Sequence, residues 1–263
     1  MSLYNIIKIK EHIYCINDKG LCSVYVIVGT NKALVIDTGI KNDEAILPQI
    51  KKITNKPLIV ALTHGHYDHT GHINEFDSFY MDVDDITSIK SRQPHNIPYI
   101  KNIIPLKNNS FDLGNITINA YKMPGHTKGS VIFVDPSDKI LFTGDQFGSG
   151  CGVWMQVLEA TNLSTYIDEI NKFKVYLATN YKNILFNEWQ FLGGHLGQEK
   201  TSRLGVYNPL NSELVDNLIE LSKGLINNTI PLQQTGAKSF NNETSYYASY
   251  KNAEMIIRKS LIN

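Results

Sequence analysis

Short apolar segments alternate with polar turn residues along the first part of the chain. Each segment is rich in β-branched and aromatic residues and is bounded by Gly, Asn, Asp or Pro, which is typical of sheet strands. Apolar residues at helical spacing predict a helix over Asn42–Ile53, and the strand on either side of it completes a βαβ-like unit. The predicted strands are Met1–Lys10 at a sheet edge, His12–Ile16, Cys22–Val28, Ala33–Ile36 and Leu58–Leu62.

The second part of the chain repeats this alternation. One apolar face predicts a helix over Leu163–Leu177, with Ser164 or Thr165 as its cap, and a second amphipathic helix spans Ser212–Lys223. We interpret Asn102–Asn109 as a solvated connection. The segments with strand character are Ile116–Tyr121, Val131–Val134, Ile140–Phe142 and the apolar stretch Glu188–Leu192.

The pattern predicts one α/β domain over residues 1–263, built from two similar halves of approximately 1–105 and 106–263. No linker, charge block or repeat of 20 to 50 residues separates the halves. The longest apolar runs contain five residues, against roughly 20 for a membrane span. The first ten residues lack the basic start and apolar stretch of a secretory signal, so we expect a cytoplasmic protein with no membrane partner.

Charge and cysteine content narrow the classes of partner. Lys plus Arg and Asp plus Glu both number 25, and this zero net charge gives no support to a nucleic-acid partner. The three cysteines, Cys15, Cys22 and Cys151, form no CxxC pair. Neither a disulfide framework nor a cysteine-based zinc site is therefore predicted.

Three histidines and one aspartate follow the strand Leu58–Leu62 in a His-x-His-x-Asp-His frame, as His64, His66, Asp68 and His69. Chance would produce this frame on the order of 10⁻⁴ to 10⁻³ times in a chain of this composition. Residues two apart at the end of a strand point the same way, so His64 and His66 can bind one metal ion. Asp68 and His69 can turn toward a second position.

Two metal ions need more than four ligands, and three later residues are of the right type. His126, Asp145 and His195 each follow a strand-like segment, and a glycine immediately precedes each of them. Glycine suits ligand-bearing loops that pack closely around an ion, and Gly65 has the same use between the first two histidines.

The order of these residues resembles that of the metallo-β-lactamase superfamily, and in particular its dinuclear members typified by glyoxalase II. The resemblance spans roughly Asp37 to His195, because Val35-Ile-Asp-Thr-Gly39 also matches an early family motif. It implies an α/β fold, the four-layer αβ/βα sandwich, with two mixed sheets flanked by helices and the metals at one edge between the halves. It also implies that Asp37 supports the metal ligands by hydrogen bonds from outside the coordination sphere. Carried over by motif, His64, His66 and His126 hold the first metal, Asp68, His69 and His195 hold the second, and Asp145 bridges them.

Two positions separate this chain from other branches of the superfamily. Zinc β-lactamases of the main subclass carry Arg where His69 stands and Cys where Asp145 stands, which disfavours antibiotic hydrolysis. Flavodiiron oxygen reductases use Glu where His66 stands and append a flavin domain. RNA-processing relatives usually add an arm or an inserted domain, and the stretch from Asp145 to His195 leaves no space for a large insertion. A small-molecule substrate is the better prediction.

The remaining candidates have plainer interpretations. We expect His12, His72 and His95 to be structural, and Cys151 to be a small buried thiol. Three apolar residues after Asp145 could wall a substrate pocket or simply belong to the core, namely Phe147, Trp154 and Met155. The tyrosines Tyr207, Tyr246, Tyr247 and Tyr250 could supply hydroxyl donors to the site.

These residues predict a metal-dependent hydrolase with two divalent ions, for which zinc is favoured and iron or manganese are alternatives. A hydroxide that bridges the ions would attack an ester, thioester or lactone carbonyl, and Asp68 would orient it. Gly152–Gln156 offers no basic residue where relatives that bind glutathione carry them, so a neutral or apolar substrate fits better. A mononuclear iron persulfide dioxygenase, a phosphodiesterase and a noncatalytic metal-binding protein remain as alternatives.

Overall fold

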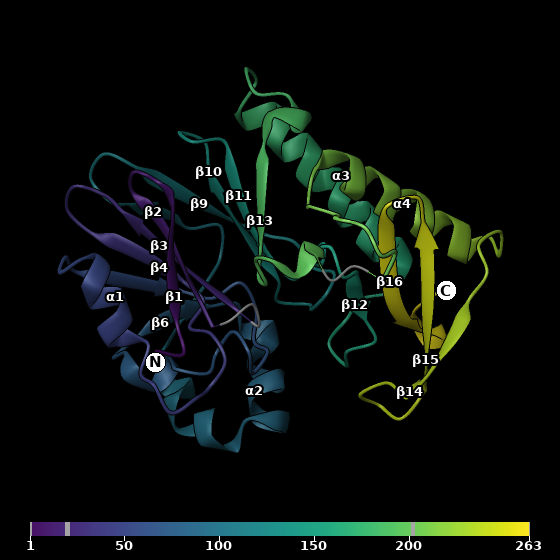
Figure 1. The fold of residues 1–263 in the computed structure, drawn as a ribbon, viewed down its shortest axis with the longest axis horizontal. Coiled ribbons are helices and arrows are strands. Elements are labelled where there is room, and N and C mark those ends of the chain that lie inside the picture. Colours follow the sequence, from purple (N-terminus) through teal and green to yellow (C-terminus); the bar gives the residue numbers. More distant parts are fainter. Residues whose placement is uncertain (1, 19–21, 201–202, 263) are drawn as a thin grey trace.

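The computed structural model describes residues 2–18, 22–200 and 203–262 and contains three β-sheets flanked by helices. Two large sheets stack face to face, and a small third sheet lies beside the helices on the far side of the second (Figure 1). Within these ranges, no helix combines the length and the apolar composition that a membrane span needs. The predicted α/β class is confirmed.

The first sheet has seven strands in the order in which they occur along the chain. The first four strands pair antiparallel with one another, and the fourth to seventh strands pair parallel, so the fourth strand belongs to both sets. The sheet is therefore mixed, as predicted. The predicted N-terminal edge strand is confirmed from Asn5 onward, whereas Met1 lies outside the described residues. The strands are β1 (Asn5–Lys10), β2 (Ile13–Asn17), β3 (Ser23–Val28), β4 (Ala33–Ile36), β5 (Leu58–Ala61), β6 (Phe79–Met81) and β7 (Ile103–Pro105).

The segment Asn102–Asn109 is only partly the solvated connection that we predicted. Its residues Ile103–Pro105 form β7, which pairs parallel with β6 at the edge of the first sheet. Two of the three β7 residues are exposed, because β7 is an edge strand and has a neighbouring strand on one side only. The sequence of this strand therefore lacks the alternation of a half-buried strand.

The second sheet has five strands in the order β13-β11-β10-β9-β8. Only β11 and β13 pair parallel, and the other neighbours are antiparallel. All four strand-like segments predicted in this half contribute to it. The strands are β8 (Ser110–Asp112), β9 (Thr117–Lys122), β10 (Val131–Asp135), β11 (Ile140–Gly144) and β13 (Gln190–Gly193).

The helices α3 and α4 begin where the sequence predicts, whereas α1 begins later than predicted and α2 was not predicted. The predicted helix over Asn42–Ile53 starts only at Leu47, because the Asn42 side chain accepts a hydrogen bond from the Glu44 N–H and stabilises a turn. The cap of α3 is Asn162, which accepts from the Thr165 N–H at 2.9 Å, rather than Ser164 or Thr165. The helices are α1 (Leu47–Ile53), α2 (Ile86–Arg92), α3 (Leu163–Asn180) and α4 (Ser212–Ile226), and short 3-10 turns span Ile73–Glu75, Val83–Asp85, Pro94–Asn102, Phe186–Glu188, Gln198–Lys200 and Lys259–Leu261.

The third sheet is an addition that the sequence did not reveal. It has the order β12-β16-β15-β14, with strands β12 (Val153–Met155), β14 (Gln233–Lys238), β15 (Thr244–Tyr250) and β16 (Ala253–Arg258). The strand β14 is polar and largely exposed, and β12 has only three residues, so neither shows a clear apolar period. This sheet packs with α4 in one apolar cluster, on the outer side of the second sheet.

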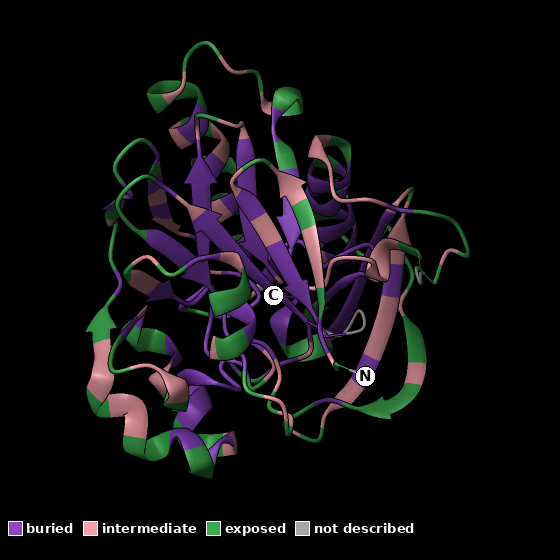
Figure 2. Ribbon diagram, turned by 60° about the vertical axis from the view of Figure 1, so that its left-hand side comes forward, coloured by how far each residue is buried: buried purple, intermediate pink, exposed green. Residues whose placement is uncertain are grey.

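Three apolar clusters separate the layers. One lies between the two large sheets, one between the first sheet and the helices α1 and α2, and one between the second sheet and α3, α4 and the third sheet. Helix, sheet, sheet and helix therefore follow one another, which is the predicted four-layer order. Buried strands run through the centre of the molecule and the exposed residues lie in the outer turns and helix faces (Figure 2).

We predict that Phe142→Ala destabilises the protein by about 3–5 kcal/mol, because it opens a cavity between the two large sheets. The Phe142 side chain is fully buried there, and its ring centroid lies 5.0 Å from that of Tyr25. Urea unfolding followed by circular dichroism measures the change. Val175→Ala, on the exposed face of α3, is the control and should change the stability by less than about 0.5 kcal/mol. Equal stability of the two variants would contradict this layering.

Candidate metal centre

The predicted ligands gather at one edge of the two large sheets, where parallel strands end. Asp37 and His64 follow the neighbouring parallel strands β4 and β5 in the first sheet. Asp145 and His195 follow β11 and β13, which are the parallel pair of the second sheet. The loop between β9 and β10 contributes His126. The carboxyl ends of parallel strands meet at one edge, so the topology brings residues far apart in the sequence together.

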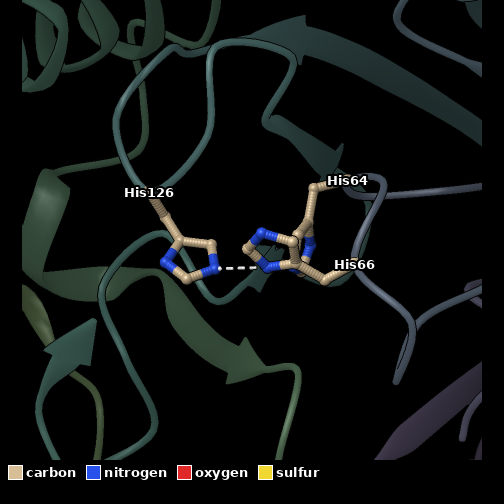
Figure 3. Close-up of side chains that lie close together, drawn as sticks. All are labelled: His64, His66 and His126. Atoms are coloured by element: carbon tan, nitrogen blue, oxygen red, sulfur yellow. Dashed lines mark hydrogen bonds between the residues drawn. The ribbon is translucent and has the colours of Figure 1, made fainter. Parts of the chain in front are cut away.

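The first group consists of His64, His66 and His126, all buried (Figure 3). The Nε2 atoms of His64 and His126 each lie 3.0 Å from Nδ1 of His66. Two nitrogens bound to one tetrahedral zinc ion at about 2.05 Å are separated by about 3.3 Å. The three rings are therefore spaced as ligands of a single ion would be.

The outward nitrogen of two of these rings has a fixed hydrogen-bond acceptor. His126 donates through Nδ1 to the Trp154 carbonyl at 2.9 Å, and His64 donates through Nδ1 to the Thr63 hydroxyl at 3.0 Å. Both inward Nε2 atoms are then unprotonated and able to bind a metal. Burial and the neighbouring histidines lower the pKa of His126 to about 4 and hold the pKa of His64 well below its usual range.

The second group consists of Asp68, His69, Asp145 and His195. Nε2 of His69 lies 3.4 Å from Oδ1 of Asp145, and Nε2 of His195 lies 3.2 Å from Oδ2 of Asp145. Oδ2 of Asp68 lies 3.6 Å from Nε2 of His195. Oδ2 of Asp145 also lies 3.8 Å from Nε2 of His126, so Asp145 stands next to both groups.

Charges in the second group are strongly coupled. Burial lowers the pKa of His69, but the carboxylates of Asp145, Asp68 and Asp37 outweigh it and raise that pKa well above its usual range. Burial raises the pKa of Asp145, but His195 and His69 outweigh it and hold that pKa well below its usual range. A cation in this group would take over the role of the protons on these histidines.

Two buried atoms test whether the residues fit a metal ion. Nε2 of His69 and Oδ1 of Asp145 form no hydrogen bond with any residue in the described part of the chain. Gly194 borders both side chains, and a Cβ added to it would lie 2.5 Å from Oδ1 of Asp145 and 2.6 Å from Cε1 of His69. Buried polar atoms without partners are rare unless a water or an ion satisfies them. Donor chemistry and space therefore both suit a divalent ion.

Asp37 holds both groups from outside, as its family motif predicts. It accepts hydrogen bonds from the Thr63 N–H at 2.7 Å, from the Thr63 hydroxyl at 2.8 Å and from Nδ1 of His69 at 2.8 Å. Thr63 in turn fixes His64, so one carboxylate orients a histidine of each group. The backbone of Asp37 has φ of 62°, a left-handed conformation that Asp tolerates better than most residues.

Asp85 is a supporting residue that the sequence analysis missed. Its buried carboxylate accepts from the N–H groups of Gly65 and Gly129, both at 2.9 Å, and from the Thr127 hydroxyl at 2.7 Å. It thus ties the loop of the first histidines to the loop of His126. A Cβ on Gly65 would lie 2.8 Å from the Asp85 Cβ, so this glycine makes room for Asp85 rather than for an ion. The only signal in the sequence is an acidic run after a short strand.

A cavity of about 350 Å³ opens onto both groups. Trp154 lines it, whereas Phe147 and Met155 are buried in the core, so the predicted apolar wall is right for one residue of three. Cys151 also lines the cavity and is half-buried rather than fully buried as we predicted, with Sγ 2.9 Å from Oε1 of Gln198. Burial raises the pKa of Cys151 to about 11, so it stays a thiol. Lining residues that the sequence analysis did not single out include Tyr67, Arg92, Val157 and Phe240.

The other histidines and the C-terminal tyrosines lie outside the two groups. His72 is buried and bonds to Glu75 at 2.7 Å, His12 pairs with Asp138 at 2.7 Å, and His95 is exposed. None of the four tyrosines is among the described residues that line the cavity, so we no longer expect them to supply hydroxyl donors there. They are Tyr207, which is exposed, and Tyr246, Tyr247 and Tyr250, which lie on β15.

Curated relatives share the sequence over part of their length. The chain is 30% identical over 131 residues to a hydroxyacylglutathione hydrolase of Buchnera aphidicola, covering 49% of each chain. It is 30% identical over 116 residues to a probable hydroxyacylglutathione hydrolase of Schizosaccharomyces pombe, covering 41% of this chain and 43% of that one. The matched region therefore spans about half the length of these relatives or less.

Solved structures and a family model agree on the fold. A metallo-beta-lactamase from Pontibacter korlensis superposes with a TM-score of 0.58 at 18% identity, covering 73% of this chain and 91% of its own. An archaeal metallo-beta-lactamase superfamily protein from Sulfolobus tokodaii gives a TM-score of 0.54 at 17% identity, covering 78% and 81%. The family model described as the metallo-beta-lactamase superfamily matches residues 17–186, which is more than half of the chain. The chain therefore belongs to the metallo-beta-lactamase superfamily, as the order of its histidines and aspartates predicts.

Proposed function

We propose that this protein is a metal-dependent hydrolase that cleaves an ester, thioester or lactone of a small molecule with two divalent ions, zinc being favoured. The observation that carries the proposal is that both ligand groups border one cavity, with Asp145 between them. The relatives named hydroxyacylglutathione hydrolase support a thioester or a related carbonyl compound as the substrate.

In this proposal His64, His66 and His126 would hold one ion, Asp68, His69 and His195 would hold the other, and Asp145, which stands next to both groups, would serve both. Two ions of this kind lower the pKa of water and polarise a carbonyl oxygen, so no serine or cysteine nucleophile is needed. The Asp68 side chain is 20% exposed and lines the cavity, where Oδ2 can accept a proton from the attacking water and orient it. Asp37 and Asp85 keep the ligand loops in place during the reaction.

The cavity wall favours a neutral or apolar substrate. Trp154, Val157 and Phe240 supply apolar surface beside the ligand groups. Arg92 is the one Lys or Arg among the described lining residues, and it already contacts the Glu159 carboxylate at 3.5 Å. A glutathione moiety carries two carboxylates and would leave at least one of them without a cation. We therefore propose a small acyl substrate that lacks glutathione.

Metal quantification followed by a substrate panel tests the proposal. Two zinc ions per chain with hydrolysis of thioesters or lactones is the expected result. One iron per chain with oxygen uptake would instead identify a persulfide dioxygenase, and activity on phosphodiesters alone would identify a phosphodiesterase. Metal binding without turnover of any substrate would favour a noncatalytic protein.

We predict that His66→Ala and Asp145→Ala each lower kcat/KM by about 100-fold or more. A metal ion supplies several kcal/mol of transition-state stabilisation, and about 1.4 kcal/mol corresponds to a factor of ten. Elemental analysis should show fewer than two ions per chain in both variants. His95→Ala, at an exposed position outside both groups, is the control and should keep the full metal content and activity. Full metal content and full activity in the double variant His66→Ala, Asp145→Ala would contradict the proposal.

We predict that removal of the metals with a chelator lowers the melting temperature as well as the activity. An ion that binds only the folded chain stabilises it by about 2.7 kcal/mol at a free concentration 100 times its Kd. Thermal unfolding with and without zinc measures the shift. The double variant His66→Ala, Asp145→Ala should show little or no shift, and an equal shift in that variant would place the metal elsewhere.

A further inference from the structure

Glu159 is a buried carboxylate that the proposed reaction does not use. It follows β12 and is 8% exposed. Its Oε2 lies 3.5 Å from Nε2 of His66 and 3.5 Å from Nη2 of Arg92. The relevant sequence separations are 93 and 67 residues, so only the fold brings these groups together.

The orientation of His66 makes this contact significant. Its Nδ1 lies 3.0 Å from the inward nitrogens of both His64 and His126, so Nδ1 is the atom that faces the ion position. A neutral imidazole that binds a metal through Nδ1 carries its proton on Nε2. That proton needs an acceptor in a buried site, and the Glu159 carboxylate is the acceptor that Nε2 faces.

The neighbouring rings show the same arrangement with other acceptors. His64 donates to the Thr63 hydroxyl, His69 to the Asp37 carboxylate and His126 to the Trp154 carbonyl. In each case the outward nitrogen is fixed by a group that is not a ligand, which sets the tautomer and the direction of the ring. Without Glu159, His66 would be the exception among these four.

We propose that Glu159 is a positioning residue for the first metal site, which holds His66 with Nδ1 toward the ion and is itself held by Arg92. This inference rests on the metal centre of the proposed function and adds a residue outside both ligand groups. Three imidazoles make up the first group, so a carboxylate beside it also adds a negative charge that favours a cation.

Arg92 and Phe240 keep Glu159 in place and charged. The Arg92 guanidinium lies 4.6 Å from the centroid of the Phe240 ring, in the turn between β14 and β15, and contacts Glu159 from the end of α2. Burial raises the pKa of Glu159, but His66 and Arg92 outweigh it and lower that pKa below its usual value. Arg92 and Phe240 also line the cavity. The residues that hold Glu159 beside His66 therefore also form part of the cavity wall.

Zinc affinity measured by chelator competition, in the absence of substrate, tests the inference. Glu159→Gln should weaken one of the two ions by about 10–100-fold, which is the usual effect of removing such a partner. The other ion, in the second group, should keep its affinity within about threefold. Cobalt-substituted protein should show a changed absorption spectrum for the affected site only.

The matched control is Glu75→Gln, which alters a second, partly buried pair of a histidine and a carboxylate outside both groups. Glu75 bonds to His72 at 2.7 Å and accepts from the N–H groups of Ile46 and Leu47 at the start of α1. Glu75→Gln should lower the melting temperature and leave both zinc affinities within about threefold.

Unchanged zinc affinities in Glu159→Gln, or an equal loss in Glu75→Gln, would overturn the positioning role and leave the proposed function intact. If Glu159→Gln does not fold, Glu159→Asp replaces it, because the shorter side chain ends about 1.5 Å farther from His66. It should weaken the same ion by about 3–10-fold, and an unchanged affinity would again overturn the inference. Failure of the unmodified chain to bind zinc would overturn the metal centre and this inference together.

Discussion

The structure depends on how four buried imidazoles are held with their metal-facing nitrogens inward. Nε2 of His64 and Nε2 of His126 each face Nδ1 of His66 across 3.0 Å, and their lone pairs repel unless a cation lies between them. The groups around these rings must therefore keep the rings from moving apart. Asp37 is one such restraint, since it accepts three hydrogen bonds, one of them from His69, and holds His64 through Thr63. Loss of that carboxylate would leave buried donors unpaired, at about 1–3 kcal/mol for each.

Asp85 restrains the loops of the first group and links the two large sheets. Asp85 comes from the helical turn before α2 and binds the Gly65 loop of the first half and the Gly129 loop of the second. Burial raises the pKa of Asp85, and its three hydrogen bonds favour the charged form. The geometry of the first group is thus set by a residue of neither ligand loop, and the metal centre and the packing of the halves depend on each other.

The sequence predicted the seven ligand candidates because they stand in a tight frame or directly after strands, where the chain leaves a sheet at a shared edge. Asp85 and Glu159 lie 20 and 93 positions from their partners at Gly65 and His66, and no local spacing marks such contacts. Most strands of the large sheets and the long helices followed from apolar periods, whereas the short strands β6, β7 and β8 did not. The third sheet did not follow from such a period, because its outer strand β14 is polar. This sheet packs against α4, and the turn between β14 and β15 contains Phe240.

The cavity wall combines ligand candidates with residues from other parts of the chain. The family match ends at residue 186, whereas Gln198 and Phe240, which line the cavity, lie beyond it. Six of the seven ligand candidates lie within the match, whereas His195 lies beyond it. A shared order of ligand candidates does not imply a shared substrate. Arg92 contacts both Phe240 and Glu159, and Glu159 faces His66, so a change in the turn between β14 and β15 would reach His66 through these contacts. Under the proposed positioning role of Glu159, substrate binding at this wall and metal affinity of the first group would therefore be coupled.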